Sequence, residues 1–116
     1  MKLDEFFRCV GGGYGEAKAR FQNDERIVRF LGMFPGDDSM QNLTNAMNTG
    51  DTTTAFRAVH TLKGVAQNLG FPHLQTAASA LTEHLRGDRP LTDRALLEDV
   101  VRAHSELTEA LSRLSA

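Results

Sequence analysis

One short segment of the chain contains the residues best suited to chemistry. Positions i, i+3, i+4 and i+7 of this segment carry His60, Lys63, Gly64 and Gln67. At about 100° per residue, these four positions form one stripe of a helix, and Phe56 lies one turn earlier on the same face. The opposite stripe is entirely apolar: Ala55, Ala58, Val59, Leu62, Val65, Ala66 and Leu69. The sequence therefore predicts a helix that buries one side and presents an imidazole beside an ammonium group on the other.

The imidazole of His60 suits nucleophilic chemistry at phosphorus. A neutral imidazole nitrogen is a competent nucleophile, and free imidazole is substantially neutral near pH 7. The nitrogen–phosphorus bond that forms is reactive, so the phosphoryl group can be passed on. The ammonium of Lys63, one turn away, is a flexible point charge that can follow the phosphoryl oxygens. An isolated surface histidine or lysine more often only solvates a helix, and the neighbouring residues favour the chemical interpretation.

Three of these neighbours indicate contact with another molecule. Gly64 stands inside a predicted helix, where glycine costs about 1 kcal/mol relative to alanine. No packing on an exposed side explains this cost, so we expect close approach by a partner. Gln67 continues the polar face, and an exposed Phe56 would favour a partner surface over the core.

The elements that position this segment are predicted to be helices. Strand-forming residues are scarce, with one Tyr and no Trp, and no segment alternates apolar and polar residues. Glycine, proline and capping residues divide the chain into helices near 2–9 and 14–21, from 23–24 to 35–36, from 37–38 to 48, and over 52–69, 72–86 and 92–114. An apolar stripe with helical spacing in the third helix contains Ile27, Phe30, Leu31 and Phe34.

Short connections after Gly36 predict an antiparallel up-down four-helix bundle. The chain is thus expected to be all-α, with one domain over 1–116: cap helices in 1–35 cover one end of a bundle formed by 37–114. The chain of 116 residues is long enough for one core.

Composition excludes several classes of function. The net charge is −2, and no basic face suited to nucleic acid is apparent. No apolar run approaches the ~20 residues needed to span a bilayer, and no signal peptide is evident. The lone Cys9 has no internal disulfide partner, which fits a reducing compartment. We therefore expect a cytoplasmic protein that binds neither nucleic acid nor membranes.

The segment His60-x-Leu62-Lys63-Gly64, with Gly70 after it, resembles the motif of histidine-containing phosphotransfer (HPt) domains. The similarity extends over most of the chain and includes three further stretches: Arg20-Phe21-x-Asn23-Asp24-Glu25, Phe30-Leu31-x-x-Phe34 and Leu74-x-x-x-Ala78-x-x-Leu81. The resemblance implies a phosphoryl carrier of multistep phosphorelays without kinase activity of its own. Its partners would be the receiver domains of response regulators and a hybrid sensor histidine kinase. The chain itself would need no cofactor, since the receiver supplies Mg²⁺, and it would act as a monomer.

Residue by residue, the resemblance makes His60 the phospho-accepting residue and Lys63 the cation that stabilises the phosphoryl group. It makes Gly64 the steric clearance for the receiver, with Gln67 as a flanking polar residue and Phe56 in a hydrophobic docking patch. Many family members have a glutamine that orients the histidine ring where this chain has Thr82. Thr82 is predicted to take over that role, directly or through water, from a polar line on the next helix that also contains Gln75, Ser79 and Arg86.

Two other functions stay open at the level of sequence. One is a helical adaptor that binds a partner without phosphorylation, and the other is the phosphodonor domain of a larger chemotaxis-type histidine kinase. The other candidate residues are predicted to be structural: His104 as a partly buried, hydrogen-bonded bundle residue, His73 and His84 as surface residues, and Cys9 as packing. No zinc or di-iron motif is present, and Gly11–Gly13 lacks the lysine of a phosphate-binding loop.

Overall fold

The structure, a computed structural model, describes residues 1–114, in which there are helices and no strand. The helices in chain order are α1 (Leu3–Cys9), α2 (Tyr14–Phe21), α3 (Asp24–Leu31), the 3₁₀ turn η1 (Phe34–Gly36), α4 (Ser39–Thr49), α5 (Thr52–Leu69), α6 (Pro72–Leu85) and α7 (Arg94–Ser112). The predicted all-α class is confirmed. No helix in residues 1–114 combines the length and the apolar composition needed to cross a bilayer.

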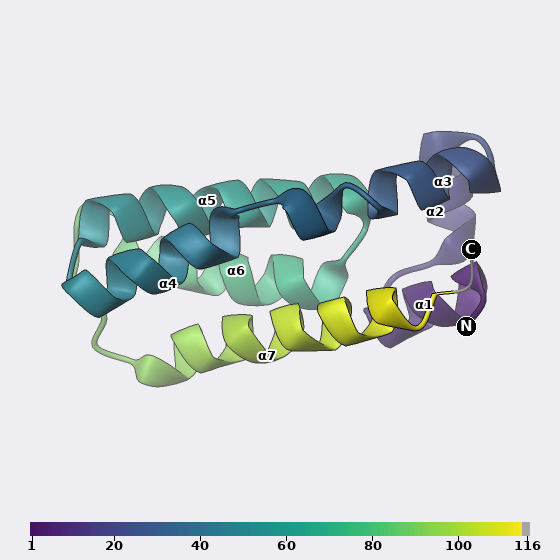
Figure 1. The fold of residues 1–116 in the computed structure, drawn as a ribbon. Helices are drawn as coiled ribbons and strands as arrows, with labels where there is room; N and C mark the ends of the chain where they lie inside the picture. Colours follow the sequence, from purple (N-terminus) through teal and green to yellow (C-terminus); the bar gives the residue numbers. More distant parts are fainter. Residues whose placement is uncertain (115–116) are drawn as a thin grey trace.

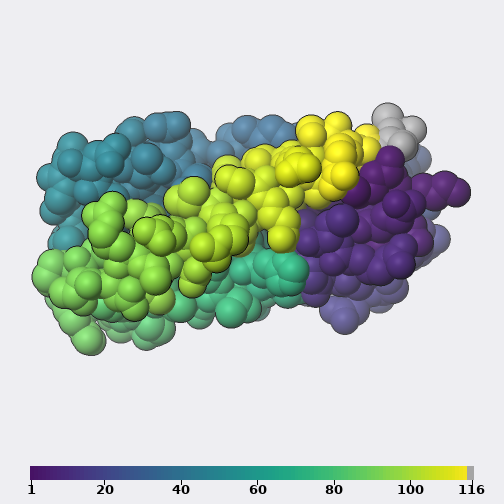
Figure 2. All heavy atoms as spheres, turned by 90° about the horizontal axis from the view of Figure 1, so that it is seen from below, coloured from purple at the N-terminus to yellow at the C-terminus, as the bar shows by residue number. Residues whose placement is uncertain are grey.

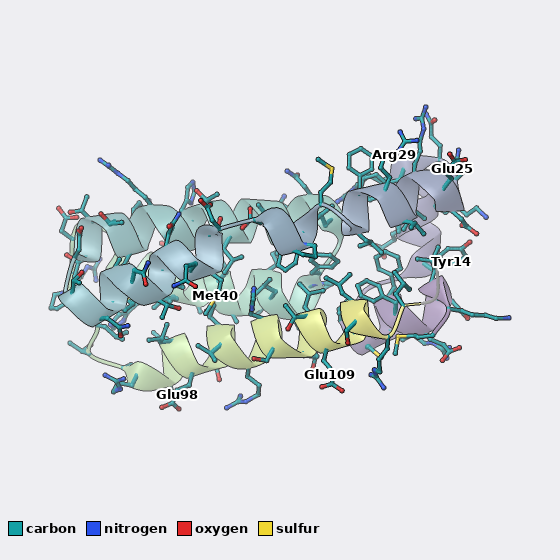
Figure 3. All side chains as sticks on the ribbon, in the orientation of Figure 1. Tyr14, Glu25, Arg29, Met40, Glu98 and Glu109 are labelled. Carbon is teal, nitrogen blue, oxygen red and sulfur yellow. The ribbon has the colours of Figure 1, made fainter. Side chains whose placement is uncertain are left out.

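Helices α4 to α7 lie alongside one another, and each runs opposite to the one before it (Figure 1). Helix α5 packs between α4 and α6, and α6 also packs against α7. The molecule is elongated, with extents of 41 × 22 × 20 Å. Charged residues such as Glu98 and Glu109 point away from the bundle along α7 (Figure 3). Helix α5, which was predicted to carry the reactive residues, is thus flanked by two neighbours, and its apolar stripe is buried except for Val65 and Leu69, which are half-buried.

The three N-terminal helices gather at one end of the molecule (Figure 1). Helix α1 packs against α2 and against the C-terminal end of α7, as Figure 2 shows on one face. There the N-terminal ammonium of Met1 donates to the carbonyl oxygen of Arg113 at 2.9 Å. The beginning and the end of the described chain therefore pack against each other at this end of the molecule.

An aromatic cluster joins these N-terminal helices to the bundle. The rings of Phe6 and Phe71 meet edge to face with centroids 6.0 Å apart, and those of Phe34 and Phe71 do so at 5.6 Å. All three side chains are buried. The backbones of the two regions also approach each other closely at Gly12, where a Cβ atom would lie 2.7 Å from the carbonyl oxygen of Gly70. Residues from the first and second halves of the chain thus share one core.

The third helix differs from its prediction at its C-terminal end. It was expected to reach Pro35–Gly36, but α3 ends at Leu31, and the proline falls in η1. Phe30 belongs to the predicted apolar stripe, but it is 38% exposed and stacks on Phe21 with centroids 4.8 Å apart. A half-exposed aromatic pair satisfies the same helical spacing as a buried side chain, so the spacing alone did not distinguish them.

Candidate functional site

Both ends of helix α5 are fixed by local interactions. Asp51 caps the N-terminus: its carboxylate accepts from the backbone nitrogen of Thr54 at 3.0 Å and from the Thr54 hydroxyl at 2.6 Å. These two hydrogen bonds lower the pKa of Asp51. At the other end Gly70 has φ 81°, a left-handed conformation that glycine adopts without strain. The helix that carries His60 is therefore closed by its own sequence at both ends.

Arg20 of α2 adds a long-range cap to the same helix. Its Nη1 atom donates to the carbonyl oxygen of Gln67 at 2.6 Å and to that of Asn68 at 2.7 Å. Carbonyls in the last turn of a helix lack helical partners, and the helix dipole favours a cation there. The N-terminal region thus contacts the helix two turns beyond His60.

The structure brings the predicted reactive residues together on one side of α5. The side chains of His60 and Gln67 are exposed, and Lys63 and Gly64 are half-buried. The ring of His60 stacks on that of Phe56, with centroids 5.9 Å apart and an interplanar angle of 5°. Within residues 1–114 Lys63 makes no ion pair, so its ammonium is available to an incoming anion.

The surface above Gly64 is open. A Cβ atom built at Gly64 would meet no heavy atom within 4 Å. No contact inside the described part of the molecule therefore requires a glycine at this position. Open space one turn after His60 leaves room for a partner to approach the ring closely.

Phe56 has a different environment from the exposed aromatic that was expected. It is half-buried and packs against the core, and its ring also stacks with that of His60. The guanidinium carbon of Arg86 lies 5.4 Å from the centroid of the same ring. Its membership of a docking patch stays a prediction.

Charged residues from the end of α6 surround this side of α5. Arg86 donates to Glu83 twice, from Nη2 to Oε1 at 2.7 Å and from Nε to Oε2 at 3.1 Å. The hydrogen bonds from Arg86 hold the pKa of Glu83 below its usual range, and the charges of Arg86, Lys63 and Arg89 add to this effect. The Glu83 carboxylate likewise raises the pKa of Arg86. The charges of Lys63 and Arg89 thus act on Glu83 together with its partner Arg86, and an anion that approaches this surface would meet these cationic side chains.

The Glu83–Arg86 pair was not predicted as part of the site. Arg86 was predicted only at one end of a polar line, and no role was predicted for Glu83. The usable signal was the i, i+3 spacing of an acid and a base near the end of a helix. What places the pair beside His60 is the packing of α6 on α5, which no spacing within α6 reveals.

Thr82 was predicted to lie in a polar line on the flank of the helix after α5, and the structure gives it a different environment. Thr82 is fully buried, and its hydroxyl donates to the carbonyl oxygen of Ala78 at 2.7 Å. A threonine that satisfies its hydroxyl on the preceding turn can enter an apolar interior, which explains the difference. No hydrogen bond joins Thr82 to His60 in the described residues.

The other histidines have structural environments. His73 is exposed, as expected, and its Nδ1 lies 2.7 Å from Oε1 of Glu106. His84 is more than a surface residue, because its Nε2 accepts from the backbone nitrogen of Thr92 at 3.1 Å in the loop before α7.

His104 is half-buried as predicted, with its ring centroid 5.6 Å from that of Phe34. The expected hydrogen bond of His104 is missing among residues 1–114, and the ring contact with Phe34 is an aromatic one. Burial lowers the pKa of His104, while the charge of Asp37 opposes the shift. Cys9 is a half-buried free thiol.

Comparison with known proteins gives one match. Residues 36–116 match the family model described as the Hpt domain. The matched range includes α4 to α7, and so both α5 and the charged end of α6. No curated protein and no solved structure matches the chain. Among residues 1–114 no group of three or more His, Cys, Asp or Glu side chains is placed to hold a metal ion.

Proposed function

Because this chain belongs to the Hpt domain family, whose members carry phosphoryl groups on histidine in two-component phosphorelays, we propose that His60 is its phospho-accepting residue. The observation that carries the proposal is the exposed His60 ring, one turn before Lys63 and beside the open surface of Gly64. Members of the family are carriers rather than kinases. In this proposal the chain takes a phosphoryl group from an aspartate of one receiver domain and passes it to another.

The transfer to His60 is a substitution at phosphorus. A ring nitrogen of neutral His60 attacks the phosphorus of the receiver's aspartyl phosphate. The new N–P bond forms as the P–O bond to the aspartate breaks, the aspartate leaves as a carboxylate, and the other ring nitrogen releases its proton to water. Lys63 stabilises the charge on the phosphoryl oxygens during transfer. Passing the group on reverses these steps with the aspartate of the next receiver.

The remaining roles follow from the same arrangement. Gly64 gives the receiver loop access to the ring, while Gln67 and Phe56 contribute to the contact surface around it. We expect no cofactor in this chain, because the divalent metal ion that transfer needs would be bound by the receiver domain. A hybrid sensor histidine kinase would supply the phosphoryl group upstream, and the chain would act as a cytoplasmic monomer.

Incubation with phosphorylated receiver domains from the same genome and Mg²⁺ tests the proposal. The full chain should acquire a phosphate that is labile in acid and stable in base, as expected of phosphohistidine. His60→Gln should abolish this labelling, whereas His73→Gln, which alters another exposed histidine, should retain it. Labelling that persisted in His60→Gln would refute the assignment of the site.

The variant Lys63→Ala tests the role proposed for Lys63 in the transfer. The variant should fold normally, since Lys63 makes no ion pair in the described structure, and it should accept the phosphoryl group more slowly from the same receiver. Stable binding of a receiver to the wild-type chain without any phosphate transfer would instead favour an adaptor.

A further inference from the structure

The His60 ring lacks the hydrogen bond that would be expected to orient a nucleophilic imidazole. In residues 1–114 the ring neither donates nor accepts a hydrogen bond, and its one ring contact is with Phe56. The residue predicted to orient it, Thr82, is buried and uses its hydroxyl hydrogen on Ala78. The orientation of the ring must therefore have another source, or else the ring turns freely.

The position of Phe56 on the helix allows its side chain to orient the His60 ring. Residues four apart are neighbours on a helix, and a long helical side chain leans toward the N-terminus over the preceding turn. The ring of His60 thus lies over the turn that contains Phe56. The two rings are nearly parallel, at 5°, with centroids 5.9 Å apart, within the range in which offset aromatic rings attract.

Phe56 is itself held in place from two sides. Its ring packs against the hydrophobic core, so it cannot swing away from α5 without exposing apolar surface. The guanidinium carbon of Arg86 lies 5.4 Å from its centroid, close enough for a cation–π interaction. Two hydrogen bonds to Glu83, at 2.7 and 3.1 Å, fix the guanidinium group in turn. The contacts therefore form a chain from α6 across α5 to the imidazole.

We propose that Phe56, held by the Arg86–Glu83 pair, is the positioning residue that orients the His60 imidazole through ring stacking in place of a hydrogen bond. The proposal deepens the function proposed above and rests on it for its biological meaning. Phe56 does not touch the reacting atoms. It restricts the rotamers of the ring, so that the nucleophilic nitrogen spends more of its time pointing toward the phosphoryl donor.

Phosphoramidate separates this role from docking. It transfers its phosphoryl group directly to an imidazole nitrogen with loss of ammonia, so no receiver is needed. Phe56→Leu keeps an apolar side chain but removes the aromatic ring. Because an aromatic pair contributes a modest interaction free energy, we expect Phe56→Leu to slow phosphoramidate labelling of the full chain by about two- to tenfold. Phe56→Tyr keeps the ring and should restore the wild-type rate.

Nuclear magnetic resonance spectra of the His60 ring report the stacking itself. The ring current of Phe56 should shift the carbon-bound protons of His60 upfield in the wild type and in Phe56→Tyr. This shift should disappear in Phe56→Leu. Arg86→Met keeps the alkyl stem without the guanidinium group, and it should reduce both the shift and the labelling rate by less than Phe56→Leu does. The matched control is Phe30→Leu, the same substitution in the stacked pair that Phe30 of α3 forms with Phe21 of α2, and it should change neither quantity.

Each outcome decides the proposal. If Phe56→Leu leaves the His60 shift or the labelling rate at the wild-type value, Phe56 does not position the ring. An unchanged His60 shift in Arg86→Met would overturn the part assigned to Arg86. Failure of every receiver to label the wild-type chain would count against the proposed function, yet the phosphoramidate rates would still report whether Phe56 orients the ring.

Discussion

Gly64 lies inside α5 with open space where a side chain would stand. Glycine in a helix interior costs about 1 kcal/mol relative to alanine, so on stability alone this position favours alanine. We predict that Gly64→Ala raises the free energy of unfolding by about 0.5–1 kcal/mol. The same change should slow phosphotransfer from a receiver, because the added methyl group would lie in the open space through which we propose that the receiver approaches. Chemical denaturation and receiver-dependent labelling measure the two effects.

Phosphoramidate provides the control for that variant, since this small donor does not need the receiver's clearance. Its labelling rate should be the same in Gly64→Ala and in the wild type. Gly64→Gln should slow receiver transfer further. Phosphotransfer from the receiver at the wild-type rate in both variants would show that Gly64 is not needed for access of the receiver.

His104 should make stability depend on pH. Burial lowers its pKa from the ordinary value of 6.5, so the unfolded chain takes up this proton more readily than the folded one. The contribution of His104 to stability is therefore complete above about pH 6.5, and it is lost as the pH falls from that value through the folded-state pKa. We predict that the loss of unfolding free energy between about pH 7 and pH 5 is smaller in His104→Gln than in the wild type. Equal losses in both proteins would contradict this.

Part of the candidate site followed from sequence because it lies within one helix. The stripe of His60, Lys63 and Gly64 depends only on helical periodicity, and the structure places the three residues together as that periodicity requires. The environment of Thr82 and the position of Arg86 over Phe56 depend on how α6 packs on α5. Spacing within a single helix does not fix the rotation of its neighbour, so these features could not be predicted.

At the scale of elements, Arg20 connects α2 to the end of α5. We predict that Arg20→Ala lowers the free energy of unfolding by about 1 kcal/mol, because the last carbonyls of α5 lose a charged donor. The loss should shrink in about 1 M salt, which screens an exposed charge. Thermal and chemical unfolding at two salt concentrations measure both effects.

Arg29→Ala is the matched control for Arg20→Ala. Arg29 is also exposed, but its partner is Glu25 on the same helix, at 3.7 Å. Exposed ion pairs of this kind contribute about 0.3–0.5 kcal/mol to the free energy of unfolding. An equal loss of unfolding free energy in the two variants would show that the Arg20 cap on α5 stabilises the protein no more than an ordinary exposed ion pair does.

The helices themselves were predicted well where capping and periodicity agree. Asn23 and Asp93 cap α3 and α7 by accepting from the backbone nitrogens of Arg26 and Ala95, at 2.9 and 3.0 Å. The C-terminal end of α3 was not predicted, since the helix ends at Leu31 before the proline is reached. A few local hydrogen bonds mark the starts of these helices, whereas after Leu31 the chain turns into η1, where Phe34 is buried.

At the scale of the whole molecule, the N-terminal helices and the bundle share their core. Phe6 is fully buried and meets both Phe7 and Phe71, with centroids 5.2 and 6.0 Å apart. We predict that Phe6→Ala lowers the free energy of unfolding by about 3–5 kcal/mol, the usual cost of removing a buried aromatic ring. Circular dichroism should show a single cooperative transition for both proteins, at a lower temperature for the variant.

A fragment of residues 36–116 tests whether the matched region folds without its cap. Removal of the first 35 residues would expose the buried ring of Phe71 and the apolar side of α7 that α1 covers. The fragment should therefore lose the cooperative transition of the full chain. Unfolding of the fragment with the stability of the full chain would show instead that the predicted single domain consists of two independent units.

The ring of His60 occupies one place on the side of an elongated molecule whose whole accessible surface is 6605 Å². A specific protein contact covers about 800 Å² on each partner, so the area around a single imidazole accommodates one receiver at a time. If His60 serves both a donor and an acceptor, they must compete for it and visit in turn. An excess of either in its unloaded form would then inhibit the other, and the ratio of the two concentrations would set the throughput of the relay.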